Sequence, residues 1–207
     1  FKMRSLIALV LILCGINTIA QDQPKLIVGI VVDQMRTDYI YRYWDKYEDD
    51  GFKKLLRDGY FCKNAHFNYI PTYTGPGHAS IFTGTTPMEH GIIANTWYDK
   101  VNKVKAYCVG DSSANSVGTD NESGKMSPHR MLAPSLGDAV RMSSLFKGKS
   151  IGISIKDRGA ILPVGHSANG AYWMDYESGK MITSDHYLEE LPSWVKKFNN
   201  MRRADKL

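Results

Sequence analysis

The stretch PTYTGPGHAS runs from Pro71 to Ser80. Its glycine and proline residues force a sharp turn, and the residues that follow can start a helix. Thr74 lies at this turn. The first backbone N–H groups of a helix have no partners within it, and the positive end of the helix dipole lies behind them. Such a corner suits an anion such as phosphate or sulfate. Thr74 is therefore our candidate for a nucleophile that attacks an anionic substrate.

An apolar run precedes this stretch, from Lys25 to Val32, and ends in Asp33. The run does not alternate in polarity, so it predicts a strand buried on both faces of a parallel sheet. Ligands of open α/β sheets bind beyond the carboxyl ends of the strands, where Asp33 would lie. Its carboxylate is a hard oxygen ligand, and we predict that it helps to hold a metal ion. Taken alone, an aspartate here is more often a helix N-cap.

The rest of the sequence predicts one α/β domain, or part of one, without an internal repeat or linker. Aromatic and charged residues at helical spacing predict a helix over 37–58 that ends at Gly59. Two β-type runs flank Tyr176–Gly179 and predict a hairpin over 171–184. The other expected elements are a strand over 61–68, a helix from Thr74 to Phe82, loops over 84–87 and 110–128, a helix over 134–146, a strand over 150–155 and a helix over 192–201.

The composition is that of an ordinary globular protein, with 43% hydrophobic and 23% charged residues among 207 and a net charge of +5. The positive charge is spread along the chain, so we expect no nucleic-acid partner. Residues 1–20 differ, because Lys2 and Arg4 precede an apolar run over 6–13 and small residues follow at 18–20. This pattern is typical of a signal peptide and is too short for a membrane span. We therefore expect a periplasmic or secreted protein with no membrane span after cleavage.

Two cysteines, Cys62 and Cys108, remain after the predicted cleavage. An exported protein can join them in one disulfide, and two buried free thiols fit equally well. The sequence leaves both states open.

Threonine is too weak an acid to attack phosphorus unaided, so Thr74 needs a base or a metal ion. Asn95 offers an amide that can donate to an oxygen where charge builds up, although by itself it is more often a turn residue. Lys156 and Arg158 follow a predicted strand, and residues two positions apart in an extended chain point the same way. A guanidinium fork and an ammonium suit a phosphate dianion, while solvated charges are the alternative. His78 is expected to fix the turn through hydrogen bonds.

The order of these segments resembles the alkaline phosphatase superfamily, and within it the nucleotide pyrophosphatase/phosphodiesterase branch. The later segments resemble the secreted bacterial alkaline phosphatases that use a threonine nucleophile. The segments that carry the likeness are Val31–Met35, Pro71–Ser80, Thr83–Pro87, His90–Asp99, Gly124–Pro128 and Ser154–Pro163.

The resemblance implies an α/β/α sandwich with a largely parallel central sheet. It also implies two zinc ions, with Asp33 and Thr74 as ligands, and a phospho-threonine intermediate formed on Thr74. Asn95, Lys156 and Arg158 would hold the phosphoryl oxygens. The Lys/Arg pair is associated with monoesterases of this family, which favours a small-molecule phosphate monoester as substrate.

Members of the family are much longer, and most of their zinc ligands lie in a second half that has no counterpart here. We therefore expect residues 21–207 to be the N-terminal portion of the catalytic domain, and this piece alone to be inactive. A phosphodiesterase or nucleotide pyrophosphatase is one alternative. A non-catalytic anion-binding remnant is another, and the oligomeric state stays open.

Overall fold

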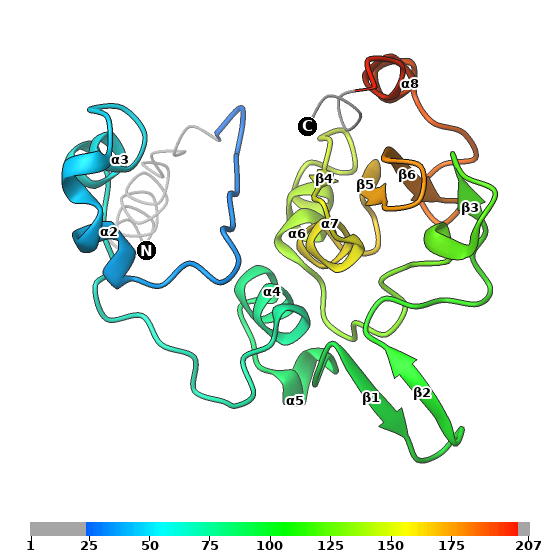
Figure 1. Cartoon of the computed structure of the whole chain (residues 1–207). Helices are drawn as coiled ribbons and strands as arrows, with labels where there is room; N and C mark the ends of the chain where they lie inside the picture. The colour runs from blue at the N-terminus through cyan, green and yellow to red at the C-terminus, as the bar shows by residue number, and fades with distance from the viewer. Residues whose placement is uncertain (1–23, 203–207) are drawn as a thin grey trace, which may run out of the picture. The chain divides into compact units, whose positions relative to one another are not determined.

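The computed structural model describes residues 24–202, and residues 1–23, which include the predicted signal peptide, lie outside the described part (Figure 1). The chain forms two compact units, Phe1–Gly59 and Tyr60–Leu207. Each unit is described by itself below.

The described part of the first unit contains short helices after residue 37. It holds α2 (Asp38–Arg42), the 3-10 helix η1 (Trp44–Lys46) and α3 (Phe52–Asp58). The prediction of one continuous helix over 37–58 is wrong. Tyr47 is extended, and Gly51 adopts a positive φ of 67° at the start of α3, so helical geometry stops and restarts. The predicted end of the helix at Gly59 is confirmed.

The apolar run over 25–32 is not a strand, which corrects our prediction. Its backbone has no regular structure, and Leu26 and Ile30 are 78% and 79% exposed. A strand forms only against a neighbour that accepts its backbone hydrogen bonds, and the described residues of this unit contain no other strand. Asp33 consequently lies in an exposed turn, which the Met35 N–H closes on the Val32 carbonyl at 3.4 Å.

The second unit contains a mixed four-stranded sheet in the order β3-β6-β5-β4. β4 (Ile151–Ile153) and β5 (Gly170–Asp175) are parallel, and α7 (Asp157–Val164) connects them. β6 (Lys180–Ser184) is antiparallel to β5 and to β3 (Ser116–Val117). The α/β class and the hairpin over 171–184 are confirmed.

A separate hairpin joins β1 (Thr96–Asp99) to β2 (Val104–Tyr107), with Thr96 opposite Tyr107 at its base. Its turn is held by the carboxylate of Asp99, which accepts hydrogen bonds from the backbone N–H groups of Val101 and Asn102. The sequence analysis did not predict this hairpin.

Helices account for most of the remaining elements of the second unit. α4 (Thr74–Thr83), α6 (Leu136–Ser143) and α8 (Ser193–Asn200) lie where helices were predicted, with shorter bounds at α6. α5 (Pro87–His90) follows the loop at 84–86, and η2 (Glu122–Gly124) and β3 lie within the predicted loop 110–128. The predicted strand over 61–68 is wrong, because these residues have no regular structure and are mostly exposed.

The core of the second unit lies where α4 and α7 pack against each other and where α7 covers β5 (Figure 1). Burial of apolar side chains at this junction stabilises the unit by about 25 cal/mol for each Å² removed from water. Packing in this way fixes the first turns of α4 and α7 relative to each other. The buried cluster contains Ala79, Ile92, Cys108, Val109, Met131, Ala160, Ile161, Leu162, Val164, Ala171, Trp173 and Ile182.

None of the helices within residues 24–202 is long and apolar enough to cross a membrane.

Candidate active site

Thr74 is the first residue of α4, as predicted. Tyr73 before it is extended and caps the helix without a side-chain hydrogen bond. The side chain of Thr74 is half-buried and stands at the end of the helix where backbone N–H groups are free of helical partners. The position of Thr74 at a helix N-terminus is therefore the predicted one, while binding of an anion there stays a prediction.

Asn95 contacts this end of the helix directly. Its Oδ1 atom accepts a hydrogen bond from the backbone N–H of Gly75 at 2.6 Å. A Cβ atom on residue 75 would lie 3.1 Å from that oxygen and 3.2 Å from Sγ of Cys108, so glycine allows the close approach. Because Oδ1 serves as the acceptor, the amide nitrogen, which can only donate, is turned to the other side of the Asn95 side chain.

His78 has the structural role that was predicted for it. Its Nδ1–H donates to the backbone carbonyl of Thr74 at 2.8 Å, and the side chain is buried. Gly159 in α7 lies next to the ring, since a Cβ atom there would be 3.9 Å from Nε2 of His78. His78 therefore fixes the first turn of α4 and lies at its contact with the first turn of α7.

Lys156 and Arg158 follow the strand β4, as predicted, but our expectation that they lie in extended chain is wrong, because they stand at the start of α7. Lys156 is the exposed N-cap, while Arg158 is the second residue of the helix, with 13% of its side chain exposed. The helix begins early because Asp157 lies in its first turn and accepts the N–H of Arg158 at 2.6 Å. The alternation of an extended chain, from which we expected both side chains to point the same way, is therefore not present here.

The Arg158 guanidinium is held by a side chain that the sequence analysis missed. Its Nη1 atom donates to the hydroxyl of Tyr107 at 2.8 Å, and that hydroxyl donates to Oδ1 of Asp157 at 2.6 Å. The Nε atom of Arg158 is buried and has no hydrogen-bond partner in the part of the chain that the structure describes. An unpaired buried donor of this kind is costly.

The hairpin base joins the two helix starts into one site. The Cys108 N–H donates to the Asn95 carbonyl at 2.9 Å, one residue beyond Tyr107. One strand of the hairpin thus begins next to Asn95, which contacts α4, and the other ends at Tyr107, which contacts α7. Thr74, Asn95 and Arg158 are connected through these contacts, all within the second unit.

Both cysteines that remain after the predicted cleavage site are free thiols. Cys62 is exposed, and Cys108 is buried under the hairpin base. Burial raises the pKa of the Cys108 thiol to about 12, so this sulfur stays protonated and packs as an apolar group.

Asp33 belongs to the first unit, so its part in the site stays a prediction. The alternative of a helix N-cap is not found, because Thr37 occupies the N-cap of α2. Across residues 24–202, no group of three or more His, Cys, Asp or Glu side chains is arranged to hold a metal ion.

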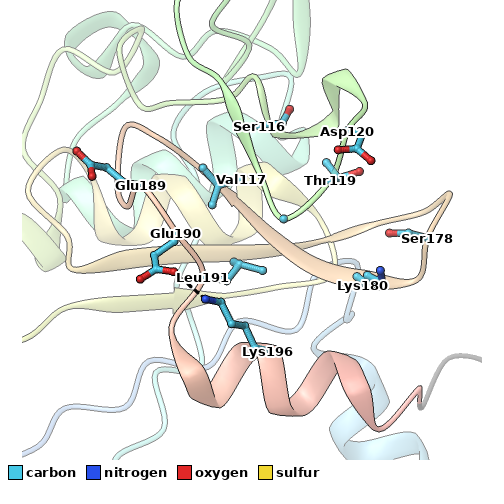
Figure 2. A pocket seen from close by; sticks show the side chains of 11 residues that line it. Ser116, Val117, Thr119, Asp120, Ser178, Lys180, Glu189, Glu190, Leu191 and Lys196 are labelled. Atoms are coloured by element: carbon cyan, nitrogen blue, oxygen red, sulfur yellow. Dashed lines mark hydrogen bonds and ion pairs between the residues drawn. The ribbon is translucent and has the colours of Figure 1, made fainter.

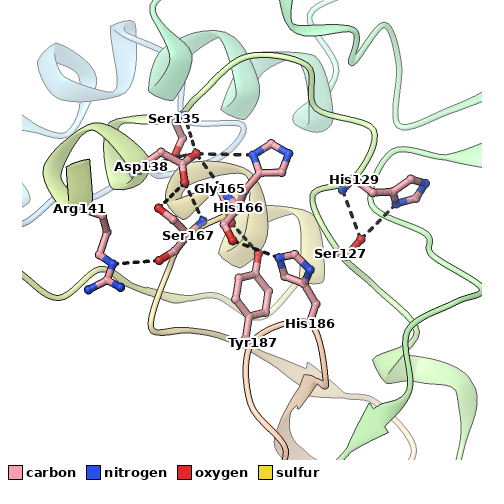
Figure 3. A network of polar contacts seen from close by, with 10 residues as sticks. All are labelled: Ser127, His129, Ser135, Asp138, Arg141, Gly165, His166, Ser167, His186 and Tyr187. Atoms are coloured by element: carbon pink, nitrogen blue, oxygen red, sulfur yellow. Dashed lines mark hydrogen bonds and ion pairs between the residues drawn. The ribbon is translucent and has the colours of Figure 1, made fainter. Parts of the chain in front are cut away.

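Two further polar regions of the second unit contain none of the predicted site residues. A pocket of about 550 Å³ lies between β3, the β5–β6 turn and the start of α8, and it is lined by lysines and carboxylates (Figure 2). Asp138 is the centre of a hydrogen-bond network with Ser135, His166 and Ser167 at the far end of α7 (Figure 3). Neither region contains a residue of the first turns of α4 and α7.

The sequence model described as type I phosphodiesterase / nucleotide pyrophosphatase matches residues 27–206. The chain belongs to this family. Alkaline phosphatase PafA of Elizabethkingia meningoseptica is 48% identical over 185 residues, or 89% of this chain and 34% of that protein. Alkaline phosphatase PhoV of Synechococcus elongatus is 48% identical over 184 residues, again 89% of this chain and 34% of that protein. This member of the phosphodiesterase family thus spans about a third of the length of these relatives.

Solved structures agree with the family. The crystal structure of wild-type PafA matches with a TM-score of 0.86 at 48% identity, over 88% of this chain and 35% of that one. A PafA variant, in which a threonine is replaced by serine and an asparagine, a lysine and an arginine by alanine, matches with a TM-score of 0.86 at 45% identity. The alkaline-phosphatase-like α/β fold and the resemblance stated from the sequence are confirmed.

Proposed function

We propose that this chain is the N-terminal part of a phosphate monoester hydrolase in which Thr74 is the nucleophile. The observation that supports this proposal most strongly is the junction of α4, the β1–β2 hairpin and α7. There a threonine hydroxyl at a helix N-terminus is connected through Asn95 and Tyr107 to a buried guanidinium whose Nε has no partner within residues 24–202. Hydroxyl, helix dipole and buried cation together favour a phosphoryl group.

In the proposed reaction, Oγ1 of Thr74 gives up its proton and attacks phosphorus. A new P–O bond to Thr74 forms while the P–O bond to the alcohol breaks, and the departing alkoxide takes up a proton. A water molecule then attacks the phospho-threonine, which restores the Thr74 hydroxyl and releases inorganic phosphate. In each step charge builds up on the non-bridging oxygens, so donors fixed around them lower the barrier.

Two side chains of the second unit would supply such donors. The amide nitrogen of Asn95 would donate to one oxygen, with its orientation fixed because Oδ1 is engaged by Gly75. Arg158 would donate from the edge of its guanidinium that carries Nε, since Nη1 is engaged by Tyr107. Removal of one donor of this type costs on the order of 10²–10³-fold in turnover.

Charge supports a monoester as the substrate class. A phosphate monoester carries more negative charge than a diester, and Arg158 with the exposed Lys156 at the start of α7 supplies two positive charges. Arginine suits a fork-like contact with two oxygens, whereas lysine provides a mobile point charge.

The comparison with PafA also supports these roles. Thr74, Asn95, Lys156 and Arg158 have the same residue types, in the same order, as the four residues replaced in the PafA variant. The lysine and the arginine are two positions apart in both proteins.

Two zinc ions, with Asp33 and Thr74 among their ligands, are part of the proposal. The described residues do not make a metal centre by themselves, since no group of three suitable side chains occurs within 24–202. We therefore derive no step through a metal. The remaining ligands would come from sequence that corresponds to the two thirds of the relatives outside this match.

Export is proposed as well. The sequence pattern of residues 1–20 would act as a signal peptide and would place the enzyme in the periplasm or outside the cell, with residues 21–207 in the catalytic domain. Small phosphate esters, rather than nucleic acids, would be its substrates there.

The proposal is tested with Lys156→Ala and Arg158→Ala in the full-length protein. We expect each change to lower kcat/KM for p-nitrophenyl phosphate, by about 10²-fold for Arg158→Ala, and to alter the rate with bis-p-nitrophenyl phosphate much less. Lys149→Ala, at the opposite end of β4 and also exposed, is the matched control for loss of a charge and should leave both rates unchanged. Unchanged rates of p-nitrophenyl phosphate hydrolysis in both variants would contradict the proposal.

A phosphodiesterase or nucleotide pyrophosphatase is the second candidate, because the family model carries that description. For such an enzyme we expect the unsubstituted protein to hydrolyse bis-p-nitrophenyl phosphate faster than p-nitrophenyl phosphate, whereas a monoesterase would hydrolyse p-nitrophenyl phosphate faster.

A further inference from the structure

Tyr107 lies at the end of β2, and its hydroxyl group is the link between the hairpin and α7. The hydroxyl contacts two residues that are 50 and 51 positions away in sequence, Asp157 at 2.6 Å and Arg158 at 2.8 Å. Both contacts fall in the first turn of α7. The proposed function assigns no task to this tyrosine.

The direction of the hydrogen bonds is fixed by the chemistry of the partners. A guanidinium can only donate, so the Tyr107 oxygen accepts from Nη1 of Arg158. A carboxylate can only accept, so the hydroxyl proton of Tyr107 goes to Oδ1 of Asp157. The chain of hydrogen bonds therefore runs in one direction, from Arg158 through Tyr107 to Asp157.

This series of hydrogen bonds requires Tyr107 to keep its proton. Burial, together with the negative charge of Asp157, raises the pKa of the Tyr107 hydroxyl well above its ordinary value. The hydroxyl therefore keeps its proton at neutral pH and serves both as donor to Asp157 and as acceptor from Arg158.

Arg158 is held at two points by this arrangement. Its backbone N–H donates to Oδ1 of Asp157 at 2.6 Å, and its Nη1 is held by Tyr107. An arginine side chain otherwise samples many rotamers, and ordering it when the substrate binds would weaken binding. With Nη1 held, the buried Nε and the neighbouring edge of the guanidinium keep one orientation.

We propose that Tyr107 is a positioning residue that orients the Arg158 guanidinium for the phosphoryl group. The hairpin that carries Tyr107 also carries Asn95 just before its first strand, and the Asn95 carbonyl accepts the N–H of Cys108, next to Tyr107. One rigid hairpin base thus sets the position of both phosphoryl-binding side chains. This inference rests on the proposed role of Arg158.

The experiment is a double-mutant cycle in the full-length protein. Tyr107→Phe removes only the hydroxyl, and we expect a loss of about 10-fold to 10²-fold in kcat/KM for p-nitrophenyl phosphate, since small displacements of a binding group have effects of this size. In the Arg158→Ala background the same change should have no further effect. The rate with bis-p-nitrophenyl phosphate should change little. A general loss of structure would instead lower both rates.

Tyr187→Phe is the matched control. Tyr187 is also a half-buried tyrosine, but its hydroxyl donates to the Gly165 carbonyl at the far end of α7. Its loss should affect monoester and diester rates equally, if at all. If Tyr107→Phe does not fold, Asp157→Ala takes its place, because it removes the acceptor of the Tyr107 hydroxyl. In the Arg158→Ala background, Asp157→Ala should likewise cause no further loss of kcat/KM.

The outcomes separate the two proposals. If Arg158→Ala lowers monoester turnover while Tyr107→Phe does not, or if the effects of the two changes simply add, the positioning role is wrong and the proposed function stands. If Arg158→Ala leaves monoester turnover unchanged, the role of Arg158 in the proposed function is wrong, and the positioning role falls with it.

Discussion

His90 is completely buried next to α4 and carries its proton on a defined nitrogen. The Ile92 N–H donates to Nδ1 at 3.1 Å, so Nδ1 is the acceptor and Nε2 carries the proton, which it donates to Oγ of Ser80 at 2.9 Å. The neutral ring therefore joins the middle of α4 to the segment that leads to Asn95. Burial lowers the pKa of His90, because an imidazolium would lose its hydration here.

This lowered pKa predicts a loss of stability in mild acid. The unfolded chain takes up the proton first, at the ordinary value of 6.5. The contribution of neutral His90 is therefore complete above about pH 6.5 and is lost as the pH falls from there towards the lowered pKa. We expect His90→Gln to cost about 1–3 kcal/mol at pH 8, through two lost hydrogen bonds, and clearly less at pH 5.5.

Urea unfolding of both proteins at the two pH values measures this. His129 and His186, whose pKa values are also lowered by burial, contribute equally to both proteins and cancel in the difference. The exposed His66, whose Nε2 atom is hydrogen-bonded to Oδ1 of Asn64, provides the control: His66→Gln should leave stability unchanged. A cost of His90→Gln that is the same at both pH values would contradict the assignment of a neutral ring.

At the scale of single residues, the sequence predicts the groups whose surroundings are local. Thr74 is at the start of its helix, and His78 bonds back to it four positions earlier, as the helical repeat requires. Tyr107 escaped prediction because its partners lie 50 and 51 positions away. A tyrosine at the end of a short strand carries no signal of such contacts.

At the scale of elements, α6 and α7 are held together by one carboxylate. Asp138 completes a capping box with Ser135 at the start of α6 and also accepts from the backbone N–H groups of His166 and Ser167 after α7 (Figure 3). Burial raises the pKa of Asp138, but the hydrogen bonds from His166, Ser135 and Ser167 outweigh it and hold the pKa well below its usual range. The carboxylate thus stays ionised.

Asp138→Ala is therefore expected to destabilise the second unit strongly. It leaves the buried donor of Ser135 and the half-buried donors of His166 and Ser167 unpaired, which predicts a loss of about 3 kcal/mol in the free energy of unfolding at neutral pH. Because the folded pKa is depressed, this contribution is present above the ordinary aspartate pKa and is lost as the pH falls below it. Thermal unfolding at pH 7 measures the effect. Glu190→Ala, which removes an exposed ion pair with Lys196, should leave the midpoint unchanged.

The elements that were predicted well are those whose pattern is complete within a short window. The hairpin over 171–184 and the helices α4 and α8 are of this kind. The run over 25–32 shows the opposite case. Its apolar composition predicts a buried strand, but a strand is a property of a pair, and no neighbour in the described part of its unit pairs with it.

At the scale of the whole molecule, the chain covers 34% of PafA and of PhoV. It holds the candidate nucleophile and the candidate phosphoryl-binding groups, but only Asp33 and Thr74 as candidate metal ligands. Divalent metals need several protein ligands to be held against water. Substrate binding and metal binding would therefore depend on different parts of the protein.

This division predicts the behaviour of the 207-residue chain. With added zinc it should hydrolyse p-nitrophenyl phosphate no faster than buffer does, because a threonine hydroxyl without metal is a poor nucleophile. The full-length protein should be active, should lose that activity in EDTA and should regain it with zinc. Robust turnover by the chain alone would show that its own residues suffice, while full activity in EDTA would remove zinc from the proposal.

The sequence by itself determined the α/β class, the start of α4 at Thr74 and the family, because each of these depends on residue types within short windows of the chain. The tertiary structure alone decided which side chains meet at the site. Asn95 accepts a hydrogen bond from Gly75, 20 positions earlier, and Tyr107 donates one to Asp157, 50 positions later. Both residues are positioned by the β1–β2 hairpin, which the sequence analysis did not predict. Such contacts exist only when the core between α4, α7 and β5 forms, since burial there fixes helix ends that are independent of each other in the unfolded chain.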